Sequence, residues 1–209
     1  GRLQSADAMM EGTRLHRKIQ QAQGGDYMSE VPLKITMTEP LYELTIDGRA
    51  DGIFTNEDGI VFVDEIKGMY RKVELLEEPF FVHQAQAMCY AYIFACQNTL
   101  ERIGVRMSYC NLDSEEMKYF TFLYSFEELR DWFFKLTDEY KKWADFQYEW
   151  RQIRQESIAG LEFPYEDRDG QKQLVADVYR TIFRGKNLFI QAPTGVGKTI
   201  STVFPAVKA

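Results

Sequence analysis

The stretch from Gly48 to Gly68, GRADGIFTNEDGIVFVDEIKG, decides the fold of this chain of 209 residues. On either side of its middle, residues 45–55 and 60–67 are rich in β-branched and apolar side chains, which favour strands. Residues 56–59, Asn-Glu-Asp-Gly, supply the chemistry of a tight turn. The pattern therefore predicts a β-hairpin, and the unbroken apolar run at 60–63 indicates that its second strand is covered on both faces.

The register of this hairpin brings two acidic side chains together. A three-residue loop with Gly59 in the left-handed conformation would pair Asn56 with Ile60. Asp51 then lies opposite Glu65, and two carboxylates on one sheet face with Cβ atoms about 5 Å apart repel each other. A divalent metal ion is the natural compensating charge. A slip of one residue would send Asp51 to the opposite face, so the prediction depends on the register.

A lysine stands beside the two acids. Lys67 follows Glu65 by two residues and therefore projects from the same face of the strand. Its ammonium group would lie at the edge of the site, which makes Asp51, Glu65 and Lys67 the candidate catalytic set. The alternative is an exposed hairpin whose acids are solvated and whose lysine only pairs with them. The apolar run just before these residues fits that alternative poorly, because it indicates a buried strand.

The composition is that of an ordinary soluble globular protein, with a formal net charge of −7. This charge argues against a surface that coats DNA in general, because non-specific affinity comes from phosphate neutralisation, so any contact with nucleic acid must be local. No run is long and apolar enough for a membrane span and no signal peptide is visible, so we expect a cytoplasmic protein without a membrane partner. The chain begins without Met, which suggests a piece of a longer protein.

The three cysteines, Cys89, Cys96 and Cys110, show no Cys-x-x-Cys spacing. Neither a disulfide framework nor a zinc or iron–sulfur site is indicated by this arrangement. We expect all three side chains to be core residues in a reducing compartment.

Further helices and strands are predicted on both sides of the hairpin. Apolar stripes indicate helices at 6–23, 81–98 and 126–155, and alternation indicates strands at 31–38, 41–46, 102–110 and 117–124. A polar loop is expected at 69–79. The order helix, three strands, helix, two strands, helix predicts an α/β sandwich around a mixed central sheet flanked by helices.

Two of these helices carry polar residues that a site could use. His16 lies in the first helix, where a lone histidine is more often a packing or surface residue than a ligand. Gln86 and Tyr90 lie one turn apart in the second helix and share a face. An amide and a phenol can bond a phosphate or a base, and they can equally form a structural pair.

A phosphate-binding loop is predicted near the C-terminus. Residues 192–199, APTGVGKT, follow a predicted short strand at 187–191 and precede a predicted helix, which is the context such a loop requires. Its backbone amides and lysine would cradle nucleotide phosphates, and its threonine hydroxyl would bind Mg²⁺. The residues involved are Gly195, Gly197, Lys198 and Thr199.

Residues 1–155 resemble the PD-(D/E)xK nucleases of the RecB type, including the CRISPR-associated exonucleases. The resemblance rests on four motifs in the order used by that family: Gly12…His16, Gly48-Arg-Ala-Asp51-Gly, Asp64-Glu65-Ile-Lys67 and Gln86-Ala-Met-Cys-Tyr90. It implies a restriction-endonuclease-like core that hydrolyses nucleic acid with Mg²⁺ or Mn²⁺. Many relatives carry a four-cysteine iron–sulfur cluster, and the positions of the cysteines here predict that this chain has none.

The resemblance also assigns roles to individual residues. It implies that His16, Asp51 and Glu65 ligate the metal, and that the carbonyl of Ile66 assists them. Lys67 would orient the attacking water. The same resemblance implies that the DNA strand is held by Gln86 and Tyr90.

The tail from Phe163 resembles the beginning of a DinG-like superfamily 2 helicase. The motifs are Phe163-Pro-Tyr165, Arg168-Asp-Gly-Gln171, the phosphate-binding loop and Ile200-Ser-Thr-Val-Phe-Pro205. The resemblance implies that Gln171 reads adenine, that ATP serves the full-length helicase only, and that further helicase domains follow on the same polypeptide. Since the acidic motif and the arginine finger are not within these residues, we expect no complete ATPase site in this chain.

The expected organisation is a nuclease domain at 1–155, a linker at 156–170 and a fragment of a P-loop helicase domain, an incomplete RecA-like segment, at 171–209. The expected function is metal-dependent hydrolysis of DNA, on single-stranded ends because a motor would feed them. One alternative is an inactive nuclease-like domain that guides DNA to the motor, and another is a nucleotide-binding regulatory module. Exonuclease polarity, exonuclease against endonuclease action, DNA against RNA, the metal and the oligomeric state stay open.

Overall fold

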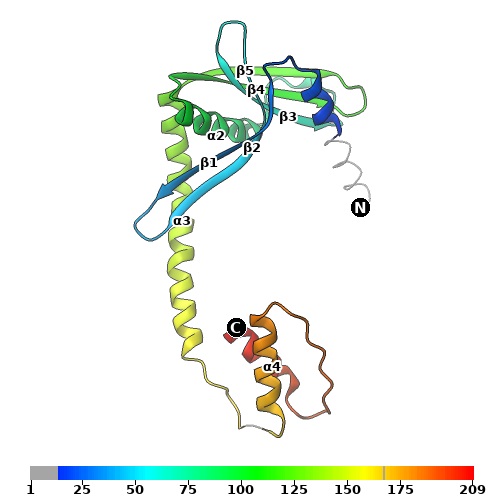
Figure 1. Ribbon diagram of the computed structural model, residues 1–209, viewed down its shortest axis with the longest axis vertical. Helices are drawn as coiled ribbons and strands as arrows, with labels where there is room; N and C mark the ends of the chain where they lie inside the picture. The colour runs from blue at the N-terminus through cyan, green and yellow to red at the C-terminus, as the bar shows by residue number, and fades with distance from the viewer. Residues whose placement is uncertain (1–13, 167) are drawn as a thin grey trace. The chain divides into compact units, whose positions relative to one another are not determined.

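The computed structural model describes residues 14–166 and 168–209 (Figure 1). The chain forms two compact units, Gly1–Tyr140 and Lys141–Ala209, and their boundary lies within the long helix α3 (Phe126–Ala159). The first unit contains a five-stranded sheet, and the second contains the helices α4 (Gln171–Phe183) and α5 (Lys198–Lys208). None of the described helices combines the length and the apolar character needed to cross a lipid bilayer.

The sheet of the first unit is mixed. Its strands lie in the order β1-β2-β3-β4-β5, with β3 and β4 parallel and every other neighbouring pair antiparallel. Helices pack on both faces of the sheet, so the predicted α/β class with a mixed central sheet is confirmed. The strands are β1 (Met28–Thr38), β2 (Glu43–Thr55), β3 (Val61–Met69), β4 (Arg102–Asn111) and β5 (Met117–Ser125).

The β2–β3 hairpin has the predicted register. Gly59 adopts a φ of 75°, and the Asn56 N–H donates to the Ile60 carbonyl at 2.9 Å. Ladder pairs run from Thr55↔Val61 back to Gly52↔Asp64, where they stop. The turn chemistry therefore sets the alignment of the two strands, and Asp51 and Glu65 occupy the next position beyond the last pair.

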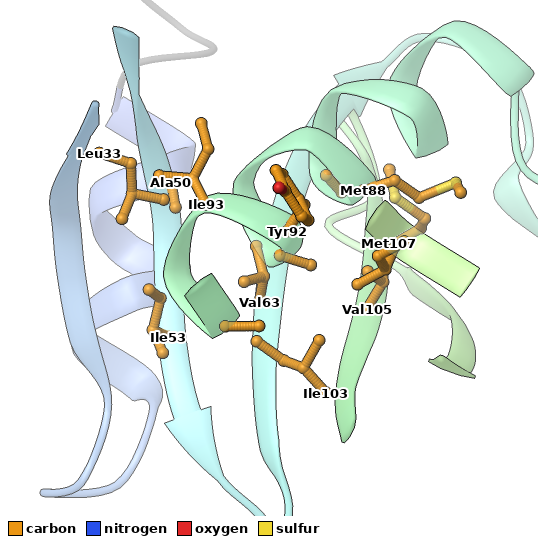
Figure 2. Close-up of a cluster of buried hydrophobic side chains, with 14 of the residues drawn as sticks. Leu33, Ala50, Ile53, Val63, Met88, Tyr92, Ile93, Ile103, Val105 and Met107 are labelled. Atoms are coloured by element: carbon orange, nitrogen blue, oxygen red, sulfur yellow. The ribbon is translucent and has the colours of Figure 1, made fainter. Parts of the chain in front are cut away.

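The crossover between the parallel strands β3 and β4 is made by α2 (Phe81–Asn98), at the predicted residues. A parallel connection needs a segment of this length, and α2 covers one face of the sheet with small and apolar side chains. Figure 2 labels Met88, Tyr92 and Ile93 of α2 in a cluster of buried side chains, where the Tyr92 ring packs on Phe126 and Phe133 of α3. The main core joins them to buried residues of β1 to β4, including Leu33, Ala50, Ile53, Val63, Ile103, Val105 and Met107, and β5 adds only partly buried side chains.

The opposite face of the sheet is covered by the helical segment at residues 14–22, the dark blue helix in Figure 1. Leu15 and Ile19 of this segment pack on Ile66 of β3 and Cys110 of β4 in a second, smaller cluster. The start of the predicted helix, including Gly12, lies outside the described residues. The segment is thereby fixed against β3, which places His16 near the hairpin.

The connection from β3 to α2 is not a plain loop, because residues Val73–Leu75 form a 3-10 turn and Val73 is fully buried.

The helix α3 begins with a reciprocal cap in which the Ser125 hydroxyl accepts the Glu128 N–H and the Glu128 carboxylate accepts the Ser125 N–H. The helix continues to Ala159, beyond its predicted end. Its buried residues, Leu129, Phe133 and Thr137, all belong to its first half.

Two local predictions are wrong. Residues 187–191 form no strand, and Phe189 is 98% exposed. A strand needs a neighbouring strand for its backbone hydrogen bonds, and the described part of the second unit contains none. Cys96 is exposed, in contrast to buried Cys110, because α2 turns its neighbour Ala95 toward the core instead.

Candidate active site where β2 and β3 separate

The candidate site lies in the fork that opens between β2 and β3 after the last ladder pair. At this point the Ile66 N–H of β3 no longer meets a backbone carbonyl of β2. It donates instead to the Asp51 carboxylate, with 2.7 Å between N and Oδ2. A side chain thus takes over a bond of the ladder, and this bond fixes the Asp51 carboxylate inside the fork.

The helical segment at 14–22 borders the same carboxylate. Its Gln20 side chain donates to the Asp51 backbone carbonyl at 2.8 Å, which ties the segment to the mouth of the fork. One turn earlier, His16 Nδ1 lies 3.7 Å from Asp51 Oδ1. The structure therefore brings His16 and Asp51 together from segments far apart in the sequence.

Glu65 is the most unusual group of the site. Its side chain is 1% exposed, and Oε1 pairs with Lys67 Nζ at 2.6 Å. Its other oxygen, Oε2, is buried without a hydrogen-bond partner among the described residues. Burial, followed by the charge of Asp51, raises the pKa of Glu65 to about 7, although Lys67 and His16 act in the opposite direction. Burial and the neighbouring carboxylate of Asp51 therefore both make the charged form of Glu65 unfavourable in this site.

The donor set is suited to a hard divalent cation. Carboxylate and carbonyl oxygens with one imidazole fit Mg²⁺ or Mn²⁺, and an orphaned buried oxygen beside a second acid is the feature that such an ion would relieve. The groups do not converge as they stand. Within residues 14–166 and 168–209, no three His, Cys, Asp or Glu side chains lie close enough to form a ready group of ligands.

The α2 side of the site continues from Lys67. Lys67 Nζ lies 3.4 Å from Gln86 Oε1, and Gln86 Nε2 lies 3.4 Å from the Tyr90 hydroxyl. A Cβ atom at Gly48 would stand 2.6 Å from that hydroxyl, so only glycine lets Tyr90 approach β2 this closely. The predicted catalytic, metal-binding and strand-holding residues of the first unit thus form one continuous series of contacts.

A buried ion pair on the other face of β3 was not predicted. Asp64 is fully buried and accepts hydrogen bonds from Arg106 Nη2 at 2.7 Å, from Ser108 and from Tyr27 at 2.8 Å. The missing Cβ of Gly52 makes room for the Tyr27 ring. The alternation of Arg106 and Ser108 along β4 was the available signal, since it marks a polar stripe within a buried strand.

A second histidine near the site was also missed. His83 Nδ1 lies 3.1 Å from the Tyr109 hydroxyl, which also accepts the Phe80 N–H at 3.0 Å. Burial and then the charge of Lys67 lower the pKa of His83, so its imidazole lies within electrostatic reach of the site. The spacing of His83, Gln86 and Tyr90 along α2 was the signal for it.

The loop of the second unit that the sequence predicts to bind phosphate contains two glycines with positive φ and a lysine bonded to the loop backbone. Gly195 and Gly197 adopt φ values of 88° and 74°, and Lys198 Nζ donates to the Ala192 and Pro193 carbonyls, each at 3.0 Å. Gln171 is buried, and its amide donates to the Ser201 hydroxyl at 3.0 Å. Thr199 lies in the first turn of α5. A pocket of about 420 Å³ borders the loop and Gln171.

Comparisons with known proteins match only short parts of the chain. No family model matches. A probable ATP-dependent helicase of Methanocaldococcus jannaschii is 44% identical over 46 residues, which are 22% of this chain and 7% of that helicase. The ATP-dependent DNA helicase DinG of Salmonella choleraesuis is 50% identical over 42 residues, 19% of this chain and 6% of the helicase, and DinG of Salmonella typhimurium matches to the same extent.

Among solved structures, one titled "Crystal structure of SSO0001" aligns with a TM-score of 0.43 and 21% identity, over 56% of this chain and 52% of that chain. The matched stretches cover less than a tenth of the length of these curated helicases.

Proposed function

We propose that the first unit is a PD-(D/E)xK nuclease domain that hydrolyses DNA phosphodiester bonds with Mg²⁺ or Mn²⁺, as an exonuclease on single-stranded ends. The observation that carries this proposal is the buried Glu65 oxygen that has no hydrogen-bond partner within residues 14–166 and 168–209, beside Asp51 and Lys67 in the fork. A structural ion pair would be satisfied, as that of Asp64 is. An acid kept unsatisfied in a buried position needs another reason.

The metal would be held by His16, Asp51 and Glu65, with the Ile66 carbonyl as a fourth donor. When bound, the ion would supply polarisation of the phosphate and a lowered pKa for water. Two of these carboxylates are already held in place, because the Ile66 N–H donates to Asp51 and the Lys67 ammonium pairs with Glu65.

Lys67 is proposed to orient the attacking water. It reaches Glu65 on one side and Gln86 on the other, so its ammonium is held at the border between the acids and α2. An ammonium group in this place donates to water and also stabilises negative charge on a phosphate oxygen. Gln86 and Tyr90 would bind the strand from the adjoining face of α2, as an amide and a phenol can.

The second part of the proposal concerns the remaining residues. We assign residues 156–170 to a linker and 171–209 to the start of a DinG-like helicase domain, with ATP as a ligand of the longer protein. The names of the helicases matched by short stretches support a role on DNA. A helicase on the same polypeptide would deliver single strands, which is why single-stranded ends are the proposed substrate.

The test is a time course of cleavage with oligonucleotides labelled at either end, in Mg²⁺, in Mn²⁺ and in EDTA. We expect cleavage that requires the ion, a loss of about two to four orders of magnitude in Lys67→Ala, and none of this loss in the exposed control Lys34→Ala. Binding of the same oligonucleotides is measured in parallel. Binding without cleavage by the wild type would instead support an inactive domain that guides DNA.

A further inference from the structure

The first turn of α2 carries a histidine that the proposed site does not use. His83 precedes Gln86 by three residues and Tyr90 by seven, so the three side chains follow one face of the helix. At a rise of 1.5 Å per residue they span about 10 Å along the helix axis. On another side of α2, Gln84 donates to the Tyr124 hydroxyl at 2.8 Å, which fixes the rotation of the helix.

The imidazole of His83 is held in one orientation. The Tyr109 hydroxyl accepts the Phe80 N–H at 3.0 Å, and its own proton then points to an acceptor. We assign this acceptor to His83 Nδ1, which lies 3.1 Å from the phenol oxygen. A ring that accepts at Nδ1 carries its proton on Nε2, so the contact also selects the tautomer. The buried Tyr109 ring cannot turn away, because it packs against Phe120 and Phe80 with centroids about 6 Å apart.

The free nitrogen of this ring is the informative atom. Nε2 has no hydrogen-bond partner among the residues that the structure describes, and the side chain is only half-buried. The charge of Lys67 acts on His83, and Lys67 also contacts Gln86. His83 therefore presents an oriented donor on the face of α2 that it shares with Gln86, the residue that contacts Lys67.

We propose that His83 is a third strand-binding residue, which donates from Nε2 to a phosphate oxygen adjoining the nucleotide held by Gln86 and Tyr90. Tyr109 acts through it as a positioning residue, since it never reaches the strand. The inference rests on the proposed function in that the ligand is the same DNA strand. It adds a contact toward the start of α2 and extends the bound length of the strand.

The test compares His83→Ala, His83→Gln and Tyr109→Phe in the full chain. Affinity is measured by fluorescence anisotropy with an end-labelled single-stranded oligonucleotide in Ca²⁺, on a Glu65→Gln background, and KM and kcat are measured in Mn²⁺ without that change. Loss of a bond to a charged phosphate should raise the Kd and KM of His83→Ala about tenfold and leave kcat within about twofold. Glutamine keeps a donor near the place of Nε2, so His83→Gln should stay within about threefold of wild type.

Two controls separate binding from a structural role. Cys96→Ala, at the far end of α2, should change neither constant, and Tyr109→Phe should fall between wild type and His83→Ala with an intact melting transition. Wild-type constants in His83→Ala overturn the inference. An equal loss in His83→Ala and His83→Gln, accompanied by a fall in melting temperature, overturns it as well.

The same measurements separate this inference from the proposed function. If the wild type binds the oligonucleotide but does not cleave it, the nuclease proposal fails while the His83 comparison is still decided by affinity. If the wild type cleaves and His83→Ala binds normally, the inference alone fails. If the wild type does not bind single-stranded DNA at all, both are overturned.

Discussion

Two neighbouring acids on β3, Asp64 and Glu65, face opposite sides of the sheet and differ in the hydrogen-bond partners around them. Asp64 is fully buried and receives hydrogen bonds from an arginine, a serine and a tyrosine. Glu65 is equally buried, yet one of its oxygens has no partner among the described residues and its pKa is raised to about 7. Burial is the same for both, so the supply of partners is what differs.

We propose that this difference separates a structural charge, Asp64, from a functional one, Glu65. A buried carboxylate whose oxygens are all satisfied by the protein has no capacity for a ligand, and removing its partner leaves an uncompensated charge. A buried carboxylate left partly unsatisfied is unfavourable for the free protein but ready to bind a cation. We therefore assign stability to the Asp64 face of β3 and chemistry to the Glu65 face.

The largest expected effect is on activity, in Glu65→Gln. The amide keeps the shape but removes the charge that would bind the metal, so we expect a loss of about 4 kcal/mol of transition-state stabilisation, or about a thousandfold in rate. The melting temperature should not fall, because the substitution removes a charge from a buried position. Cleavage assays and thermal unfolding measure the two effects. Glu57→Gln in the exposed hairpin turn is the matched control, and retained activity in Glu65→Gln contradicts the assignment.

The next effect is on stability, in Arg106→Met. The substitution leaves Asp64 buried without its main partner, and breaking such a pair costs about 3–5 kcal/mol. Chemical denaturation measures the loss. The double variant Asp64→Asn with Arg106→Met removes both charges and should recover most of it. A double variant no more stable than Arg106→Met would show that the arginine acts through its packing on Phe54, where its guanidinium lies 4.1 Å from the ring centroid, and not through Asp64.

The sequence was sufficient for the parts of this picture that depend on local chemistry. The turn residues before Ile60 predicted the register, because a glycine at a φ of 75° permits only a few hairpin geometries. The register in turn predicted that Asp51 and Glu65 lie opposite each other on one face of the sheet. The limits of α2 followed from its apolar stripe and from the polar loop expected at 69–79 just before it.

Other features depend on contacts that the sequence does not display. The partners of Asp64 lie 37 to 44 residues away, so no residue close to Asp64 in the sequence indicates that its charge is paired. Only the sheet order, with β4 parallel beside β3, brings Arg106 and Ser108 to it. The prediction of a strand at 187–191 was wrong because a strand also depends on distant partners. Its apolar residues favour a strand, but no neighbouring strand is described in the second unit.

A bound cation should stabilise the folded chain through the Glu65 face of β3 and not through the Asp64 face. A ligand that binds only the folded chain contributes about 2.7 kcal/mol when its concentration is about a hundredfold above its Kd. We expect Mn²⁺ to raise the melting temperature of the wild type and of Arg106→Met by similar amounts, because the Asp64 face takes no part in binding. It should leave Glu65→Gln unchanged. Equal shifts in the wild type and Glu65→Gln would show that Mn²⁺ binds elsewhere.

The smallest effect tests whether the partners of Asp64 are redundant. Tyr27→Phe removes one donor, with 2.8 Å between the hydroxyl and Asp64 Oδ2, and leaves Arg106 and Ser108 in place. One hydrogen bond to a carboxylate that keeps two other partners should contribute about 1–2 kcal/mol to the free energy of unfolding. Cleavage should be unaffected, since the Tyr27 hydroxyl bonds the structural acid of β3. A loss of activity at an unchanged melting temperature would mean that the two faces are coupled through the strand, and the separation of stability from chemistry would then fail.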